Sequence, residues 1–163
     1  MSPRSFHLTS GLLFVSLLLA GVSTAKPSRV VLPVVPQPTP VSDEKPGFFP
    51  YRGVSIGMTA DAARGALGSP KEKSNEMDLY IFSESETAQI FYDAQQQVKA
   101  IAITFSGDLK AAPTAKMIFG EDVAPRPDGG IFKMVRYPKA GFWVSYNKTA
   151  GDDAVISIAI QKM

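Results

Sequence analysis

Cysteine is absent from the sequence, and histidine occurs only once, as His7. Without cysteine there is no disulfide bond, so stability has to come from an ordinary hydrophobic core. We also expect no lipid anchor of the bacterial lipoprotein type, because its processing site requires a cysteine. If the segment around His7 is removed on export, the mature chain lacks both residue types. That argues against Ser-His-Asp and Cys-His catalysis and most zinc or copper sites, so we predict no catalytic residue, no metal site and no cofactor.

A strong charge of either sign is lacking as well. The chain has 17 Lys and Arg residues against 15 Asp and Glu residues, a formal net charge of +2. Nucleic-acid-binding proteins carry a clear basic excess, so we expect no nucleic-acid partner. The apolar run at residues 11–22 is shorter than the roughly 20 residues of a membrane-spanning helix.

The amino-terminal segment has the layout of a secretory signal peptide. Arg4 precedes the apolar run, and small residues follow it up to Ala25. This pattern predicts a signal peptide over residues 1–25. We expect a periplasmic or secreted protein that is soluble and has no integral membrane span after cleavage near Ala25. Six prolines in residues 26–46 predict a semi-rigid linker.

The remaining residues, 47–163, are predicted to form a single α+β domain. It contains an internal repeat, with one unit over about residues 52–107 and a second over about residues 108–163. Each unit reads as one short helix followed by three strands in an antiparallel meander. The alignment pairs Gly68 with Gly120, Tyr80 with Phe132, Tyr92 with Tyr146, Ile101 with Ile158, and Ile103 with Ile160.

Capping residues bound both predicted helices. In the first unit, Thr59 is a suitable N-cap and Gly68 a suitable C-cap, with Pro70 just beyond it. In the second unit, Pro113 suits the first helical turn and Gly120 the stop. Helices this short need a sheet to pack against.

The strands alternate between bulky apolar and small or polar residues, which predicts a curved sheet with the helices on one face and an open second face. The open face is expected to carry Val98, Ala100, Ala102 and Thr104 in the first unit, and Val155, Ser157, Ala159 and Gln161 in the second.

The opening of the domain resembles a known repeat module. The residues that match the module's pattern are Gly57, Met58, Thr59, Leu67, Gly68, Pro70, Tyr80, Phe82, Tyr92, Asp93, Val98 and Ile101. They resemble the module of the SmpA/OmlA-type outer-membrane assembly lipoproteins and of the tandem-repeat β-lactamase inhibitory protein, here without the lipid-anchor cysteine. The resemblance implies a non-enzymatic protein-binding or scaffold module whose partner is another envelope or secreted protein.

Exposed aromatic side chains on the open face are the predicted anchors for that partner. We expect Trp143 and Tyr146 to bind it in the second unit, and Tyr80 and Tyr92 in the first. Basic residues at the rim are predicted to steer the partner electrostatically. These are Arg136 and Lys139.

Two other functions stay open on the sequence. An Asp/Glu-dependent carbohydrate hydrolase of the envelope requires two carboxylates that converge in a pocket, with raised pKa values. The available acidic residues are Glu84, Glu86, Asp93, Asp152 and Asp153. A small-ligand carrier requires an enclosed apolar pocket.

Overall fold

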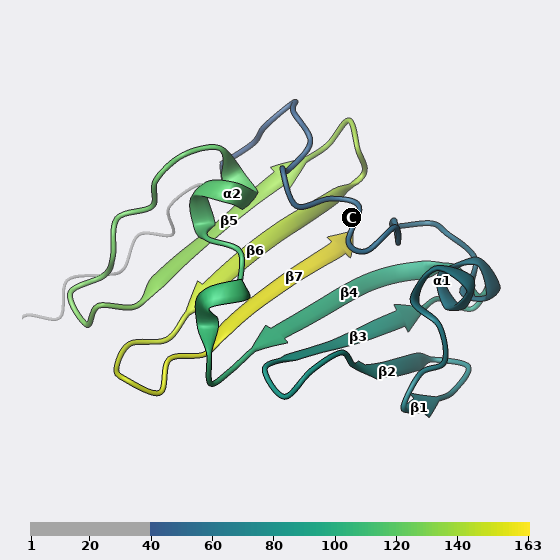
Figure 1. Ribbon diagram of the computed structural model, residues 1–163. Helices are drawn as coiled ribbons and strands as arrows, with labels where there is room; N and C mark the ends of the chain where they lie inside the picture. Colours follow the sequence, from purple (N-terminus) through teal and green to yellow (C-terminus); the bar gives the residue numbers. More distant parts are fainter. Residues whose placement is uncertain (1–39) are drawn as a thin grey trace, which may run out of the picture. The chain divides into compact units, whose positions relative to one another are not determined.

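The structure, a computed structural model that describes residues 40–163, is one seven-stranded antiparallel sheet with two short helices (Figure 1). The predicted signal peptide and the first part of the predicted linker lie outside the described residues. The strand order is β1-β2-β3-β4-β7-β6-β5. The elements are β1 (Glu72–Lys73), β2 (Met77–Ile81), β3 (Glu86–Tyr92), β4 (Val98–Phe105), β5 (Ile131–Tyr137), β6 (Phe142–Lys148), β7 (Ile156–Lys162), α1 (Ala60–Leu67), α2 (Ala115–Phe119) and the 3₁₀ helix η1 (Leu109–Ala111). The α+β prediction is confirmed.

Side-chain caps fix where the two α-helices begin. The hydroxyls of Thr59 and Thr114 each accept a backbone N–H three residues further on, at 3.3 and 3.2 Å. Gly68 and Gly120 end the helices at φ values of +84° and +76°, which glycine adopts without a steric penalty. The prediction that Pro113 lies in the first turn of the second helix is wrong, because Thr114 caps that helix and Pro113 precedes the cap.

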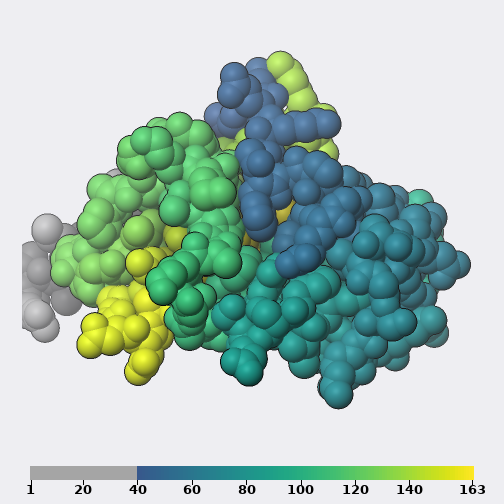
Figure 2. All heavy atoms as spheres, viewed as in Figure 1, coloured from purple at the N-terminus to yellow at the C-terminus, as the bar shows by residue number. Residues whose placement is uncertain are grey.

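One face of the sheet carries the core, and we call it the covered face. Both helices and the segment before α1 lie over it (Figure 1). Seen from this side, these segments hide most of the central strands (Figure 2). The buried strand residues that point to it are Asp78, Tyr80, Ala88, Ile90, Tyr92, Val98, Ile101, Ile103, Phe105, Val135, Tyr137, Phe142, Val144, Tyr146, Ile156, Ile158 and Ile160.

The centre of the sheet is the pairing of β4 with β7. Ile101 lies opposite Ile160, and Ile103 opposite Ile158. All four side chains are at most 1% exposed, and burying one isoleucine stabilises a fold by about 1.5–3 kcal/mol. This apolar pairing joins β2–β4 to β5–β7.

Val98 departs from the predicted alternation. A register shift between Phe91 and Tyr92 places Val98 opposite Tyr92, and its side chain is fully buried. Such a bulge inserts one extra residue into the strand, so the side chains before it point to the opposite face of the sheet from the one that alternation predicts. The prediction that Val98 lies on the open face is therefore wrong, whereas the facing predicted for Ala100, Ala102 and Thr104 is confirmed.

The last residues of the predicted linker are held against the sheet. Ser42 donates its N–H to the carbonyl of Arg136 at 2.8 Å, and Arg136 donates to the carbonyl of Pro40 at 2.9 Å. Further along, the N–H of Gly47 reaches the carbonyl of Ile118 in α2 at 2.9 Å. Residues 40–46 thus extend the folded part beyond its predicted start.

Among residues 40–163, no helix combines the length and the apolar character that crossing a bilayer requires.

Candidate functional site

The second face of the sheet is lined by three rows of residues that run across β2, β3, β4, β7, β6 and β5; we call it the open face. The first row is Met77, Phe91, Ala100, Gln161, Trp143 and Arg136. The second row is Leu79, Gln89, Ala102, Ala159, Ser145 and Met134, and the third is Ile81, Thr87, Thr104, Ser157, Asn147 and Phe132. All of these residues are partly or fully exposed.

Within the three rows, Arg136 is the only charged residue. Large apolar side chains stand among the others, and Ile81 and Phe132 remain 55% and 45% exposed. A sheet face that meets only water normally carries polar side chains. The open face instead mixes polar side chains, which make up most of the third row, with several aromatic and aliphatic groups and few charges, and Arg126 lies over the ring of Phe132. Such a mixture is typical of protein contact surfaces.

Trp143 lies on the open face as predicted. Arg136, predicted at the rim, lies on the same face directly opposite Trp143, on the edge strand β5. Tyr80, Tyr92 and Tyr146 do not lie on the open face. All three are at most 2% exposed and belong to the core on the covered face, so the prediction that they anchor a partner is wrong. Because side chains alternate along a strand, Trp143 and Tyr146, three residues apart, have to face opposite sides.

Lys139 lies in the turn between β5 and β6, where its Nζ is 2.7 Å from a carboxylate oxygen of Asp43. Both side chains are largely exposed, so this ion pair is weak. Lys139 is thus placed at the rim, as predicted, but its charge is partly offset by Asp43.

A buried polar cluster joins α1 to the sheet. The carboxylate of Asp78 on β2 accepts from Arg64 Nε at 2.8 Å, from Arg64 Nη2 at 3.2 Å and from the hydroxyl of Tyr92 at 2.8 Å. Burial favours a higher pKa for Asp78, but the hydrogen bonds from Arg64 and Tyr92 outweigh it and hold the pKa below its ordinary value. Sequence reasoning missed this cluster; its one signal was an acidic residue at a core-facing position, two residues before Tyr80.

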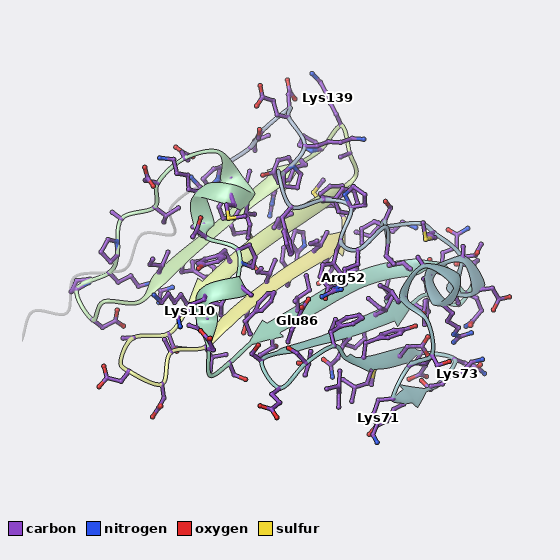
Figure 3. The ribbon with its side chains drawn as sticks, in the orientation of Figure 1. Arg52, Lys71, Lys73, Glu86, Lys110 and Lys139 are labelled. Carbon is purple, nitrogen blue, oxygen red and sulfur yellow. The ribbon has the colours of Figure 1, made fainter. Side chains whose placement is uncertain are left out.

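A second cluster lies at the start of the domain on the same side of the sheet. Glu86 of β3 accepts from Tyr51 Oη at 2.8 Å, from Arg52 Nε at 3.1 Å and from Arg52 Nη2 at 2.6 Å. Figure 3 shows Arg52 and Glu86 directed toward each other. Burial raises the pKa of Glu86, and hydrogen bonds from Arg52 and Tyr51 lower it by more. Both clusters therefore hold ionised carboxylates in place.

No family model, no curated protein and no solved structure matches this chain. Its function has to be argued from the geometry of its own residues.

The acidic residues considered for hydrolysis are dispersed. Glu84, Asp152 and Asp153 lie in turns, and Asp93 follows β3, where backbone N–H groups of Gln97 and Gln95 lower its pKa. General acid catalysis at neutral pH needs a carboxyl group with a raised pKa, and the shifts of Asp78, Glu86 and Asp93 are all downward. Residues 40–163 also contain no group of three or more His, Cys, Asp or Glu side chains placed to hold a metal ion.

An open cleft of about 530 Å³ lies on the covered side, between the segment before α1 and the start of α2. Its wall includes Phe48, Phe49, Phe105 and Met117, with the Arg52–Glu86 ion pair among the lining groups. The volume is in the range of small-molecule sites. The ion pair is satisfied internally, however, and presents no polar group that lacks a partner to fix a ligand.

Proposed function

We propose that this protein is exported to the cell envelope, where it binds another protein through the open face of its sheet and catalyses no reaction. The observation that carries the proposal is the composition of that face. Phe91, Phe132 and Trp143 supply aromatic surface, while Arg136 is the only charge in the three rows. Aromatic residues are enriched and charges depleted at the centres of protein interfaces.

Of the two faces of the sheet, only the open face is available to a partner. The helices and the segment before α1 already pack on it (Figures 1 and 2). On the open face, the described residues leave large apolar side chains in contact with water. Apolar side chains left in water on a sheet face support an interaction site there.

We also propose that the domain is a duplicated unit, with repeats over residues 52–107 and 108–163. In the first half, α1 is followed by the two-residue β1 and then by β2, β3 and β4; in the second half, α2 is followed by β5, β6 and β7. In each half the last three strands are consecutive neighbours in the sheet. The β4–β7 register supports the duplication, because a twofold axis between the strands exchanges Ile101 with Ile158 and Ile103 with Ile160.

The ion pairs between helix regions and strands support the same proposal. In the first half, Arg64 of α1 binds Asp78 of β2. In the second half, Glu121, just after α2, binds Lys133 of β5. If the same twofold exchange is followed outward through the strand registers, Asp78 of β2 corresponds to Lys133 of β5. Each half thus ties its helix region to the equivalent strand position, with the charges reversed.

The likeness of residues 54–105 to the SmpA/OmlA-type module agrees with a binding role in the envelope. Thr59 and Gly68, two residues of the shared pattern, form the caps of α1. They account for the fold of the module, and the proposed partner contacts lie on the strands instead.

Site-directed crosslinking tests the proposed function. Because the chain has no cysteine, a single cysteine carrying a short photoreactive reagent marks one position. The labelled chains are added to envelope fractions of cells that naturally make this chain. We expect Ser145→Cys and Ser157→Cys, both on the open face, to crosslink to the same partner protein. Met117→Cys is the matched control, since Met117 is 61% exposed but lies in α2 on the covered side.

Equal crosslinking from Met117→Cys, or none from the two open-face positions, would reject the open face as the binding surface.

A further inference from the structure

The outer side of β5 carries backbone groups that can pair with a further strand. β5 is the last strand in the order of the sheet, so β6 is its only neighbour in that order (Figure 1). Backbone groups that point away from β6 recur at every second residue. Arg136 is one of these residues, because its N–H donates to the carbonyl of Pro40 and its carbonyl accepts from the N–H of Ser42. By alternation, Phe132 and Met134 point their N–H and carbonyl groups the same way.

Both ends of this outer edge are occupied. At the start of β5, the carbonyl and the N–H of Gly130 bond within the turn of residues 126–130. Near the end of β5, residues 40–42 pair with the strand. Between these two contacts, no group of the described residues pairs with the outward N–H and carbonyl groups of Phe132 and Met134. An edge with such groups is a template for an added strand.

The chain itself enters the described residues along this edge. Val41 forms a parallel bridge with Arg136, so the chain already runs in the direction of β5 at this point. A segment that is covalently joined to its site acts at a millimolar effective concentration. The residues just before Pro40 are therefore favoured over a strand of equal affinity from another molecule at lower concentration.

The sequence of that segment keeps it extended. Residues 37–40 read Gln-Pro-Thr-Pro, with proline at every second position. Proline fixes φ near −65°, and a residue before proline is restricted to extended conformations. All four residues are thus confined to extended conformations before any pairing. Such preorganisation lowers the entropy that is lost when the segment is immobilised.

We infer that residues 37–39 continue along β5 as an additional parallel strand, with Thr39 beside Met134 and Gln37 beside Phe132. This is the register that the parallel bridge sets for the residues before it. The side chains of Thr39 and Gln37 then extend the second and third rows of the open face, and the segment shields the edge of the sheet from other chains. The contact lies within one chain, so it does not depend on the proposed partner.

The described contact also gives the hydrogen bond that this strand adds. Arg136 donates its N–H to the carbonyl of Pro40, and two residues earlier the N–H of Met134 donates to the carbonyl of Pro38. Because proline has no N–H, neither proline donates a hydrogen bond back to β5. The added strand has fewer hydrogen bonds than an ordinary ladder, so its covalent connection to Pro40 is part of what holds it in place.

Disulfide trapping in the full chain tests this register, because the chain has no cysteine of its own. The two in-register variants combine Gln37→Cys with Phe132→Cys, and Thr39→Cys with Met134→Cys. Their Cα atoms should lie about 5 Å apart, the distance between neighbouring strands, which a disulfide can bridge. The two matched controls exchange the partners, Gln37→Cys with Met134→Cys and Thr39→Cys with Phe132→Cys. A shift of two residues places these Cα atoms about 8 Å apart, beyond the reach of a disulfide.

We expect each in-register pair to oxidise at least about tenfold faster than either exchanged pair, because the exchanged pairs require backbone movement. Thiol labelling followed by mass spectrometry measures the rates. Phe132 and Met134 are not buried, so the substitutions leave the core intact, which circular dichroism checks. A smaller difference between the two groups would overturn the inference, as would disulfides that mainly join two copies of the chain. Either result leaves protein binding by the open face untouched.

Discussion

The Asp78→Ala variant is expected to lose about 3–4 kcal/mol of unfolding free energy, because removing one member of a buried ion pair leaves its partner uncompensated. Asp78 has a fully buried side chain, and Arg64 opposite it is only 17% exposed. Without the carboxylate, the hydroxyl of Tyr92 also loses its acceptor. Urea unfolding of the two proteins measures the difference.

Asp61→Ala is the matched control for this variant. Asp61 also lies near Arg64, with 3.5 Å between Asp61 Oδ1 and Arg64 Nη1, but its side chain is 98% exposed. An exposed pair of this kind contributes about 0.5 kcal/mol or less. If Asp78→Ala changed the unfolding free energy no more than Asp61→Ala does, the cluster would not anchor α1 to the sheet.

The pH dependence of that difference gives a second readout. The folded-state pKa of Asp78 lies below the ordinary value of 3.8, so the ionised form is the one that stabilises the fold. The stability gap between wild type and Asp78→Ala is therefore complete above pH 3.8 and shrinks as the pH falls through the folded-state pKa. A gap that widened toward acid would contradict an ionised Asp78 in the native state.

The Ala159→Arg variant is expected to bind the partner at least about 30-fold more weakly than wild type. Ala159 lies at the centre of the open face, so an arginine there would be buried without a countercharge on binding. An unpaired charge in an interface costs about 2–5 kcal/mol, and each 1.4 kcal/mol changes affinity tenfold. Titration against the partner captured by crosslinking measures the loss.

Ala62→Arg on the exposed side of α1 is the control for this substitution. It introduces the same charge on the covered side and should leave partner affinity within about threefold of wild type. Since Ala159 already borders water in the free protein, both variants should unfold within about 1 kcal/mol of wild type. If Ala159→Arg bound the partner as tightly as wild type does, the centre of the open face would not be part of the binding surface.

Local signals in the sequence predicted most of the secondary structure. Thr59 and Gly68 cap α1 as predicted, because both act through contacts within one helical turn. Six of the strands follow from alternation over five to eight residues. The two-residue strand β1 escaped prediction, since it is too short to show a period.

The facing of individual side chains was harder to predict. The alignment of Tyr80 with Phe132 pairs a buried residue with one on the open face, because the sequence match does not follow strand register. The bulge at Lys99 turns the side chain of Val98 to the covered face, opposite to the predicted facing. A bulge is defined by the pairing of a strand with the strand beside it. The sequence alone does not give that pairing, so it does not reveal the extra residue.

Contacts between distant residues lay beyond sequence reasoning altogether. Arg64 and Asp78 are separated by β1 and two turns, and Arg52 and Glu86 by 34 positions. Pro40 and Ser42 pair with Arg136 at the other end of the domain. Their partners are fixed by the folding of the sheet, and no local pattern identifies them.

The most direct test of the central claim uses the fluorescence of Trp143, the only tryptophan of the chain, which lies partly exposed on the open face. For a tryptophan-free fragment or variant of the captured partner, binding should shift Trp143 emission to shorter wavelength and reduce quenching by acrylamide. A partner that bound with unchanged Trp143 emission and quenching would contradict recognition through the open face.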